Sequence, residues 1–357
     1  MKKKIVIATG GSGGHLYPAM ATAEELIESG QAEVLFVGMG LDHNPFFLRE
    51  RYSHVDVPSA FHPKNIFSLI KGFIKSIKVL KAFQADIAIG FGSYHSLPPL
   101  LAAILLKVPI ALHEANSFPG KVVRLLSRFS KVTGVQFPVA ASRIKGSTAL
   151  IPLPLRKEYD RKYVDRIASA AYFGIDPSKT TLLVFGGSQG ALGINRAFDE
   201  SLLNLLKNKL ASFQVLHFSG SQEETSRLKA VYQKSEIHAV IKSHEPFMNH
   251  AWGCSDLLIA RAGASTIAEQ LAFEIPAVYI PFPGAADNHQ FFNALFVANE
   301  VKGGDFLLQE EMNSTLLAQK ILAILSEDVH KSNLIQQIQG YKRQHSNQTF
   351  AEWILKL

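Results

Sequence analysis

The chain has 357 residues, which exceeds the size at which one hydrophobic core usually stops growing, so two domains are expected. Hydrophobic residues at 47% and charged residues at 19% are typical of a folded globular protein and exclude an intrinsically disordered one. A formal net charge of +7 favours anionic partners, without choosing among phosphorylated substrates, nucleic acid and acidic lipid.

Export and membrane signals are weak. Cys254 is the single cysteine, so an internal disulfide is excluded and nothing indicates an oxidising compartment. The apolar run Ile5–Ala8 is shorter than the roughly 7–15 residues of a signal-peptide core. The run Leu100–Leu106 is too short to span a bilayer. We therefore expect a cytosolic chain without an integral membrane segment.

Short aliphatic segments alternate with helical patterns along the chain. Helical spacing is seen at Pro18–Glu28 and Ser265–Phe273, among other places. The alternation predicts parallel sheets with helices on both faces, in which ligands bind at the carboxyl ends of the strands. The expected strands are Lys4–Ala8, Val34–Val37, Ile87–Ile89, Ile110–His113, Thr181–Phe185, Val215–Phe218, Asp256–Ile259 and Ala277–Ile280.

A weak internal repeat divides the chain. Ile5–Gly14 reads IVIATGGSGG and Leu182–Gly190 reads LLVFGGSQG, so each half has a strand, a Gly-Gly-Ser turn and then a helix. The proline-rich segment Ile151–Leu155 lies between them as a linker. We expect an α/β protein of two Rossmann-like domains, 1–157 and 158–342, whose parallel sheets face each other across a cleft. A helix over 343–357 is expected to pack back on the first domain.

The two glycine loops are candidate phosphate sites. Glycines allow a sharp turn that exposes backbone N–H groups, and the following helix dipole favours an anion. The alternative is tight strand–helix packing alone. A dinucleotide motif is disfavoured, because Leu16 stands where a third glycine is needed and Val37-Gly38 where an acidic residue is needed. A Walker lysine is missing after both loops, which disfavours ATP.

His15 ends the first loop. A histidine in this place can remove a proton near neutral pH. It can also simply satisfy the backbone at the start of the helix, and these residues alone leave both interpretations open.

Seven segments, in order, resemble a known family. The chain is similar to the MurG family, which adds N-acetylglucosamine to a lipid-linked muramyl-peptide in peptidoglycan synthesis. The segments are Gly10–Ala19 (GGSGGHLYPA), Gly90–Ser96 (GFGSYHS), His113–Asn116 (HEAN), Pro152–Arg156 (PLPLR), Gly186–Asn195 (GGSQGALGIN), Arg261–Glu269 (RAGASTIAE) and Pro281–Asn293 (PFPGAADNHQFFN).

The resemblance implies a GT-B fold and an inverting hexosyltransferase. The domain 1–157 is expected to take the undecaprenyl-diphosphate-linked muramyl-pentapeptide. The domain 158–342 is expected to take UDP-N-acetylglucosamine. The family acts peripherally at the cytoplasmic face of the inner membrane, on an anionic surface and beside other cell-wall synthesis proteins. Roles in cell wall biogenesis, cell shape and cell division follow, and nucleic acid is not an expected partner.

The resemblance also assigns residues. His15 is the expected general base. Arg156 is expected to pair with diphosphate charge, Glu269 to accept from the ribose hydroxyls with help from Thr266, and Gln290 to bind sugar hydroxyls. The family binds uracil near Pro246–Met248, where Glu245 replaces a usual aliphatic residue. The substrate-binding set implied is Ser12, Gly13, Gly14, Asn116, Arg156, Ser188, Gln189, Met248, Thr266, Glu269, His289 and Gln290.

One family loop is altered. Leu97 and Pro98 replace the later glycines of the loop that begins at Gly90. The assignment of this loop to the lipid diphosphate is therefore open.

Metal and cofactor dependence are not expected. The sequence contains no D-x-D triplet, the element that often holds Mg²⁺ or Mn²⁺ on a nucleotide-sugar diphosphate. Helix dipoles and Arg156 can serve instead. Substantial turnover in the presence of EDTA is expected, and its complete loss would contradict this prediction.

A basic amphipathic segment spans Asn65–Phe83. Lysines 71, 75 and 78 recur at helical spacing, and an apolar stripe is expected from Phe67, Ile70, Phe73, Ile74 and Ile77. Such a helix can lie on anionic lipid, or it can pack on a core with its lysines in water.

Two other functions are weighed. One is another GT-B enzyme, such as a glycolipid synthase or a UDP-sugar epimerase, which the product formed from UDP-N-acetylglucosamine would reveal. The other is a non-catalytic nucleotide-sugar binding protein, in which His15→Ala would not change UDP release.

Overall fold

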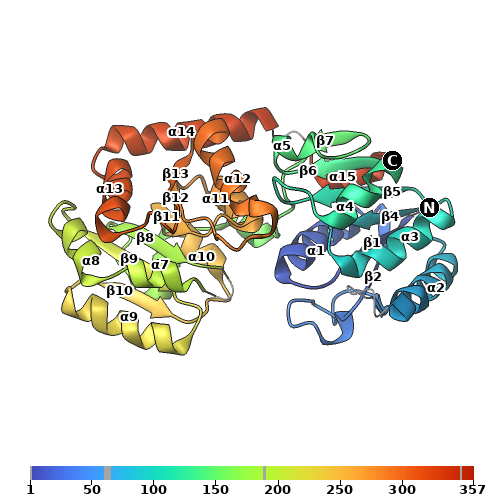
Figure 1. Ribbon diagram of the computed structural model, residues 1–357, viewed down its shortest axis with the longest axis horizontal. Helices are drawn as coiled ribbons and strands as arrows, with labels where there is room; N and C mark the ends of the chain where they lie inside the picture. The colour runs from blue at the N-terminus through green and yellow to red at the C-terminus, as the bar shows by residue number, and fades with distance from the viewer. Residues whose placement is uncertain (1, 60–65, 188–189, 346–347) are drawn as a thin grey trace. The chain divides into compact units, whose positions relative to one another are not determined.

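The protein is described by a computed structural model at residues 2–59, 66–187, 190–345 and 348–357. The chain forms two compact units. The first comprises Met1–Arg156 and His345–Leu357, and the second comprises Lys157–Gln344. Figure 1 shows that each unit is a sheet with helices on both of its faces.

The first unit contains a parallel seven-stranded sheet of order β3-β2-β1-β4-β5-β6-β7. The chain therefore reverses its direction of winding between β1 and β4, and such a switch point is where open α/β sheets bind ligands. The strands are β1 (Lys3–Ala8), β2 (Ala32–Gly38), β3 (His54–Asp56), β4 (Ile87–Gly90), β5 (Ile110–Glu114), β6 (Ser130–Val135) and β7 (Thr148–Leu150).

Helices cover both faces of this sheet because alternate residues of β1 point in opposite directions. Ile5 and Ile7 pack with α1 and α15, whereas Val6 and Ala8 pack with α2, α3 and α4. The helices are α1 (Gly13–Glu28), α2 (Ile66–Phe83), α3 (Leu97–Leu105), α4 (Lys121–Leu126), α5 (Pro138–Ala141) and α15 (Phe350–Lys356).

The carboxy-terminal segment differs from the single helix expected over 343–357. Two helices occupy this segment instead. Helix α14 (Asp328–His345) ends at His345, and α15 (Phe350–Lys356) begins with a capping box formed by Thr349 and Glu352. Helix α15 packs on the first unit, where Lys3 Nζ donates to the Leu355 carbonyl at 3.1 Å.

The second unit repeats the topology. Its six parallel strands have the order β10-β9-β8-β11-β12-β13, so the switch point lies between β8 and β11. The strands are β8 (Thr180–Phe185), β9 (Phe213–Phe218), β10 (Ala239–Lys242), β11 (Leu257–Ala260), β12 (Ala277–Tyr279) and β13 (Gly304–Phe306). The predicted fold, two parallel α/β sheets of GT-B type, is confirmed.

The helices of the second unit again lie on both faces. Helices α7, α8, α9 and α13 share one hydrophobic core. On the other face, the Phe185 ring meets the Trp252 ring of α10 at 5.8 Å. The helices are α6 (Arg166–Phe173), α7 (Leu192–Ala197), α8 (Glu200–Lys207), α9 (Gln222–Lys234), α10 (Met248–Gly253), α11 (Ala264–Phe273), α12 (His289–Phe296), α13 (Ser314–Leu325) and α14.

All eight predicted strands are present, with ends that differ by at most a few residues. Five further strands, β3, β6, β7, β10 and β13, were not predicted; four of these have three or four residues. The first helix begins at Gly13 rather than near Pro18, which places Ser12 at its N-cap and His15 in its first turn. Within the described residues, no helix is both long enough and apolar enough to cross a membrane.

Candidate active site

The loop after β1 makes a tight turn at the first switch point. Gly11 has φ of +87°, a conformation that favours glycine. A Cβ on Gly10 would lie 2.8 Å from the Met39 carbonyl oxygen and 2.7 Å from the Cβ of His95. Glycine is therefore required at both positions, and the turn delivers His15 to the start of α1.

The His15 side chain connects the start of α1, which follows β1, with the chain just after β4. Its Nδ1 lies 2.8 Å from the carbonyl oxygen of Phe91, the residue after β4. A carbonyl only accepts, so Nδ1 carries the proton and the neutral ring keeps a lone pair on Nε2. Burial lowers the pKa of His15, the Phe91 bond opposes that effect, and nearby His95 adds to it. The ring is thus a neutral base at pH 7.

The loop after β4 brings a second histidine to the same turn. The His95 ring lies against the backbone of Gly10 and Gly11. Its Nδ1 is 2.7 Å from the Ser93 hydroxyl, and Ser93 has φ of +68°. Leu97 and Pro98, which replace the expected glycines, form the first turn of α3 instead of extending the loop. Neither Ser93 nor His95 was predicted from the sequence to have a role.

The other loop-1 residues lie at the start of α1. Ser12 and Gly14 are exposed, and a Cβ on Gly13 would meet the Tyr17 ring at 2.8 Å. The guanidinium of Arg156 lies 4.8 Å from the centroid of that same ring. Tyr17 therefore holds a cation beside the amino end of the helix.

Asn116 lies one strand away, after β5. Its backbone N–H donates to the Glu114 carboxylate at 2.9 Å, and the Gly120 N–H donates to the other oxygen at 2.9 Å. Burial raises the pKa of Glu114 to about 7, although these hydrogen bonds oppose the rise. Glu114 thus shapes the loop that carries Asn116, a role that the sequence did not reveal.

His113 is a structural residue. It is fully buried between the rings of Phe91 and Phe350, and its Nε2 lies 3.2 Å from the Ile151 carbonyl. Burial lowers its pKa to about 4, so the ring is neutral.

The corresponding loop of the second unit follows β8. Ser188 and Gln189, both predicted to bind substrate, lie outside the described residues. Gly190 has φ of +74°, and a Cβ there would lie 2.3 Å from the Ser219 carbonyl oxygen. Asn195 fixes the same carbonyl by donating from Nδ2 at 2.9 Å.

A buried network supports this second loop. His217 lies 3.1 Å from the Asn195 amide oxygen through Nε2 and 3.0 Å from the Tyr232 hydroxyl through Nδ1. Burial lowers the pKa of His217 to about 3, and nearby Arg227 adds to the effect. This histidine is a neutral scaffold residue.

Helix α11 starts across the second switch point, after β11. Gly263 is its N-cap, and Thr266 and Glu269 lie along the helix, both partly exposed. The indole N–H of Trp252 donates to Glu269 Oε2 at 2.8 Å. One oxygen of the carboxylate is therefore fixed by α10, a contact that the sequence did not indicate.

His289 and Gln290 begin α12. His289 Nδ1 lies 2.7 Å from the Ala286 carbonyl, and the side-chain oxygen of Gln290 accepts from the Phe282 N–H at 3.0 Å. The Gln290 side-chain oxygen is therefore engaged within its own loop. The amide nitrogen of Gln290 is the group suited to sugar hydroxyls.

Met248 begins α10, beside Glu245. The Glu245 carboxylate accepts from the Phe247 N–H at 2.8 Å and the Tyr172 hydroxyl at 3.0 Å, and it pairs with Lys242 at 2.7 Å. Burial alone would raise the pKa of Glu245, but the bond to Lys242 and the other hydrogen bonds hold it below its usual value. Glu245, which replaces the usual aliphatic residue of the family, therefore holds the segment just before Met248 through these bonds.

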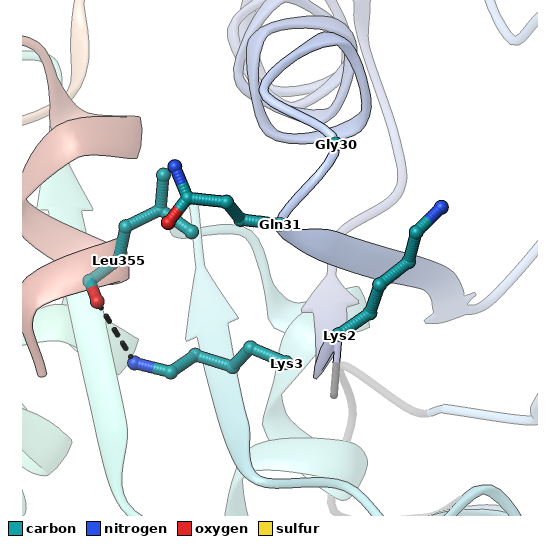
Figure 2. Close-up of a pocket in the computed structure, with 5 residues that line it drawn as sticks. All are labelled: Lys2, Lys3, Gly30, Gln31 and Leu355. Carbon is teal, nitrogen blue, oxygen red and sulfur yellow. Dashed lines mark hydrogen bonds between the residues drawn. The ribbon is translucent and has the colours of Figure 1, made fainter.

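A surface hollow of about 470 Å³ lies elsewhere in the first unit. Figure 2 shows its lining residues: Lys2, Lys3, Gly30, Gln31 and Leu355. Leu355 lies on α15 and the other four lie at the amino ends of β1 and β2, whereas His15 follows the carboxyl end of β1. The hollow is separate from the switch point.

Comparison with known proteins agrees with this geometry. Residues 5–135 match the glycosyltransferase family 28 N-terminal domain, and residues 181–349 match the C-terminal domain of that family. A Protochlamydia amoebophila (strain UWE25) protein is 39% identical, with 99% of this chain and 96% of the relative covered. It is named UDP-N-acetylglucosamine–N-acetylmuramyl-(pentapeptide) pyrophosphoryl-undecaprenol N-acetylglucosamine transferase. The chain belongs to the MurG family of glycosyltransferases.

Further likenesses support this assignment. A Chlamydia pneumoniae protein of the same name is 34% identical over 99% of both chains. The crystal structure of Acinetobacter baumannii MurG matches with a TM-score of 0.77 and 25% identity, covering 99% of this chain and 98% of that one. The resemblance inferred from the motifs is confirmed. The chain is an enzyme of the hexosyltransferase class, and the non-catalytic alternative is not supported.

Proposed function

We propose that this chain transfers N-acetylglucosamine from UDP-N-acetylglucosamine to a lipid-linked N-acetylmuramyl-pentapeptide, making the disaccharide lipid precursor of peptidoglycan. The name shared by the full-length relatives supports these substrates over those of an epimerase or a glycolipid synthase. In the proposal the first unit takes the acceptor and the second unit takes the donor.

The tautomer of His15 is the observation that carries the proposed mechanism. The Phe91 carbonyl fixes the proton on Nδ1, so Nε2 can take the proton from the acceptor hydroxyl. The hydroxyl oxygen then forms a bond to the anomeric carbon while the bond from that carbon to the UDP phosphate breaks. One displacement of this kind inverts the anomeric centre.

Most of the proposed donor roles belong to groups in the second unit, and Arg156, the last residue of the first segment of the first unit, is the exception. The Glu269 carboxylate, oriented by Trp252, suits the ribose hydroxyls as an acceptor of hydrogen bonds. Glycine-rich loops after a strand suit a diphosphate, which supports Gly186–Gly190 for that part of the donor. Arg156 supplies a fixed positive charge that suits the charge developing on UDP. Thr266, Met248, His289 and Gln290 complete the proposed donor set.

The test is UDP release with a lipid-linked muramyl-pentapeptide analogue in wild type and His15→Gln. Glutamine cannot act as a base, so kcat is expected to fall by about 10²–10⁴ while UDP-N-acetylglucosamine affinity is unchanged. The matched control is His43→Gln, because His43 is an exposed histidine of the same unit. Turnover of His15→Gln within threefold of wild type would contradict the proposal, as would an epimerised sugar as the product.

We also propose that α2 holds the enzyme peripherally on the anionic cytoplasmic face of the membrane. The predicted apolar stripe is divided in the structure. Phe73 and Ile77 pack on the core, whereas the side chains of Ile66, Phe67, Ile70 and Ile74 are exposed. The Phe67 side chain is 81% exposed. Apolar surface in contact with water is unfavourable, so its burial in lipid would stabilise the bound state.

Binding to vesicles tests the membrane proposal. All three lysines are exposed, but Lys75 donates to the Asp56 carbonyl at 2.6 Å, so only Lys71 and Lys78 are changed. Lys71→Glu/Lys78→Glu is expected to weaken binding to anionic vesicles about tenfold or more, because each lysine near such a surface contributes about 1 kcal/mol. Lys229→Glu/Lys234→Glu on α9 is the control. Equal binding of all three proteins would contradict the proposal.

A further inference from the structure

Arg261 is a buried cation at the carboxyl end of β11. It directly follows Ala260, the last residue of that strand, and is 8% exposed. Burial lowers the pKa of its guanidinium, and among the described residues no charge opposes that effect. Arginine stays protonated even so, because its ordinary pKa is far above 7. The charge depends instead on neutral hydrogen-bond acceptors.

Three oxygen atoms accept from the Arg261 guanidinium. Its Nη1 donates to the carbonyl oxygens of Ile280 at 3.0 Å and Pro281 at 3.1 Å. Its Nη2 donates to the side-chain oxygen of Gln309. The Phe282 ring lies over the same group, with the ring centroid 5.4 Å from Cζ. Since the planar guanidinium presents its N–H groups in a fixed fork, these contacts set the position of the chain that follows β12.

The Gln309 side chain lies between Arg261 and helix α7. A Cβ on Gly193, in the first turn of α7, would lie 2.6 Å from the Gln309 oxygen, so glycine is needed there to leave room for this side chain. Gln309 follows β13 and is half-buried. Packing against α7 therefore holds the acceptor oxygen within reach of Arg261. No role was predicted for Gln309 from the sequence.

A single peptide group joins Arg261 to Gln290. The Pro281 carbonyl accepts from Arg261. The Phe282 N–H of the same peptide donates to the Gln290 side-chain oxygen at 3.0 Å. The peptide is planar, so a guanidinium that fixes its C=O also fixes its N–H. Because an N–H can only donate, Gln290 presents its oxygen to Phe282 and keeps its amide N–H groups for another partner.

The positive charge of Arg261 also acts along this chain of bonds. A cation at the Pro281 carbonyl draws electron density from the peptide and makes the Phe282 N–H a stronger donor. The Gln290 oxygen that accepts from it is polarised in turn, which strengthens the N–H groups on Gln290 Nε2 as donors. Arg261 thereby affects both the direction and the strength of the Gln290 amide.

We propose that Arg261 and Gln309 are positioning residues for the donor sugar. Gln309 holds the guanidinium, the guanidinium holds the Pro281–Phe282 peptide, and that peptide directs the Gln290 amide to the sugar hydroxyls. This inference rests on the proposed function, in which Gln290 contacts the N-acetylglucosamine of the donor. Gln309 acts through other groups, so its loss weakens binding of the sugar part of the donor and not the transfer step.

The experiment compares Gln309→Leu with Gln309→Glu. Leucine has a similar size but no acceptor, so the KM for UDP-N-acetylglucosamine is expected to rise about fivefold while kcat stays within about twofold. Glutamate keeps an acceptor oxygen for Arg261 and is expected to have the wild-type KM. Gln233→Leu, at an exposed position of α9, is the matched control. An unchanged donor KM in Gln309→Leu would overturn the inference.

Inhibition by UDP separates positioning from a general structural role. UDP lacks the sugar, so its Ki is expected to be unchanged in Gln309→Leu, which also shows that the variant is folded. Arg261→Lys keeps the charge but loses the fork, and it is expected to raise donor KM about tenfold with the same unchanged Ki. An equal rise in donor KM and UDP Ki would overturn the inference, because the whole donor site would then be disturbed.

A double-mutant cycle tests whether Gln309 acts through Gln290. Gln290→Leu by itself is expected to raise donor KM about tenfold. Adding Gln309→Leu to Gln290→Leu is expected to raise KM no further, because the amide that Gln309 positions is already gone. Asn293 donates to the Ala262 carbonyl at 3.0 Å and so anchors α12 independently of both changes. Fully additive effects of the two changes would contradict the inference.

Failure of this inference can be told from failure of the proposed function. If wild type makes the disaccharide lipid and Gln290→Leu raises donor KM, but Gln309→Leu does not, the positioning role alone is refuted. If Gln290→Leu leaves donor KM unchanged, the donor role of Gln290 is refuted together with this inference. If wild type makes no disaccharide from the lipid-linked acceptor, the proposed function is refuted and the inference falls with it.

Discussion

The two glycine loops begin from nearly the same sequence but are supported in different ways. The first loop is lined by His15 and His95, two partly exposed rings that are hydrogen-bonded to the Phe91 carbonyl and the Ser93 hydroxyl. The second is supported by His217, which is fully buried and bonded to Asn195 and Tyr232. The same motif therefore lies beside partly exposed histidines in one unit and beside a buried hydrogen-bond network in the other.

This difference has a physical basis. A partly exposed imidazole whose pKa is only lowered can still exchange a proton with a substrate. An imidazole whose pKa burial brings to about 3, with both nitrogens engaged, cannot. A glycine loop by itself therefore does not indicate a catalytic site. The exposure and the pKa of the side chains around it do.

The largest effect on stability is expected from Gly190→Ala. The added Cβ would be forced to within 2.3 Å of the Ser219 carbonyl oxygen at a φ of +74°, and a loss of about 3 kcal/mol in unfolding free energy is expected. Gly187→Ala in the same loop is the control: its φ is +91°, but no atom of the described residues lies within 4 Å of the added Cβ, so a loss of about 1 kcal/mol is expected. Urea unfolding measures both, and equal losses would show that the close contact is not what requires glycine.

A smaller effect is expected from His217→Phe. It leaves the Asn195 oxygen and the Tyr232 hydroxyl without this partner, at a cost of about 2 kcal/mol, with kcat unchanged. The exposed His238→Phe is the control in the same unit. A fall in kcat at unchanged stability would show that His217 takes part in the reaction.

The pH dependence of the unfolding free energy is a second measurement that tests His217→Phe. Because burial lowers the pKa of His217 to about 3, the folded state binds fewer protons than the unfolded state below about pH 6.5. The unfolding free energy therefore falls as pH drops below 6.5. This slope is expected to be shallower in His217→Phe.

The smallest expected effect is a shift in the pH–rate profile. Burial lowers the pKa of His15, so kcat/KM is expected to hold constant at neutral pH and to decline only below pH 6.5, as Nε2 becomes protonated. Nearby His95 also lowers this pKa, so His95→Phe is expected to raise the midpoint. A midpoint above 6.5 in the wild type would mean that a different group is the base.

Much of the molecule follows from the sequence itself. Eight of the strands, the α/β alternation and the repeated glycine loops were predictable, because periodicity and glycine turns are local properties of the chain. Strands such as His54–Asp56 and Gly304–Phe306 were not, since three residues carry too little pattern and owe their conformation to a neighbouring strand.

The family motifs named His15 and Glu269, but only the tertiary structure decided their states. Phe91, the residue after β4 and 76 residues further along the chain, fixes the proton on His15 Nδ1, and Trp252, from another helix, orients Glu269. Likewise, only the fold shows that Ser93 and His95 lie against the first glycine loop. The sequence gives the residue types. The protonation and orientation of these side chains depend on partners that are distant along the chain and adjacent in space.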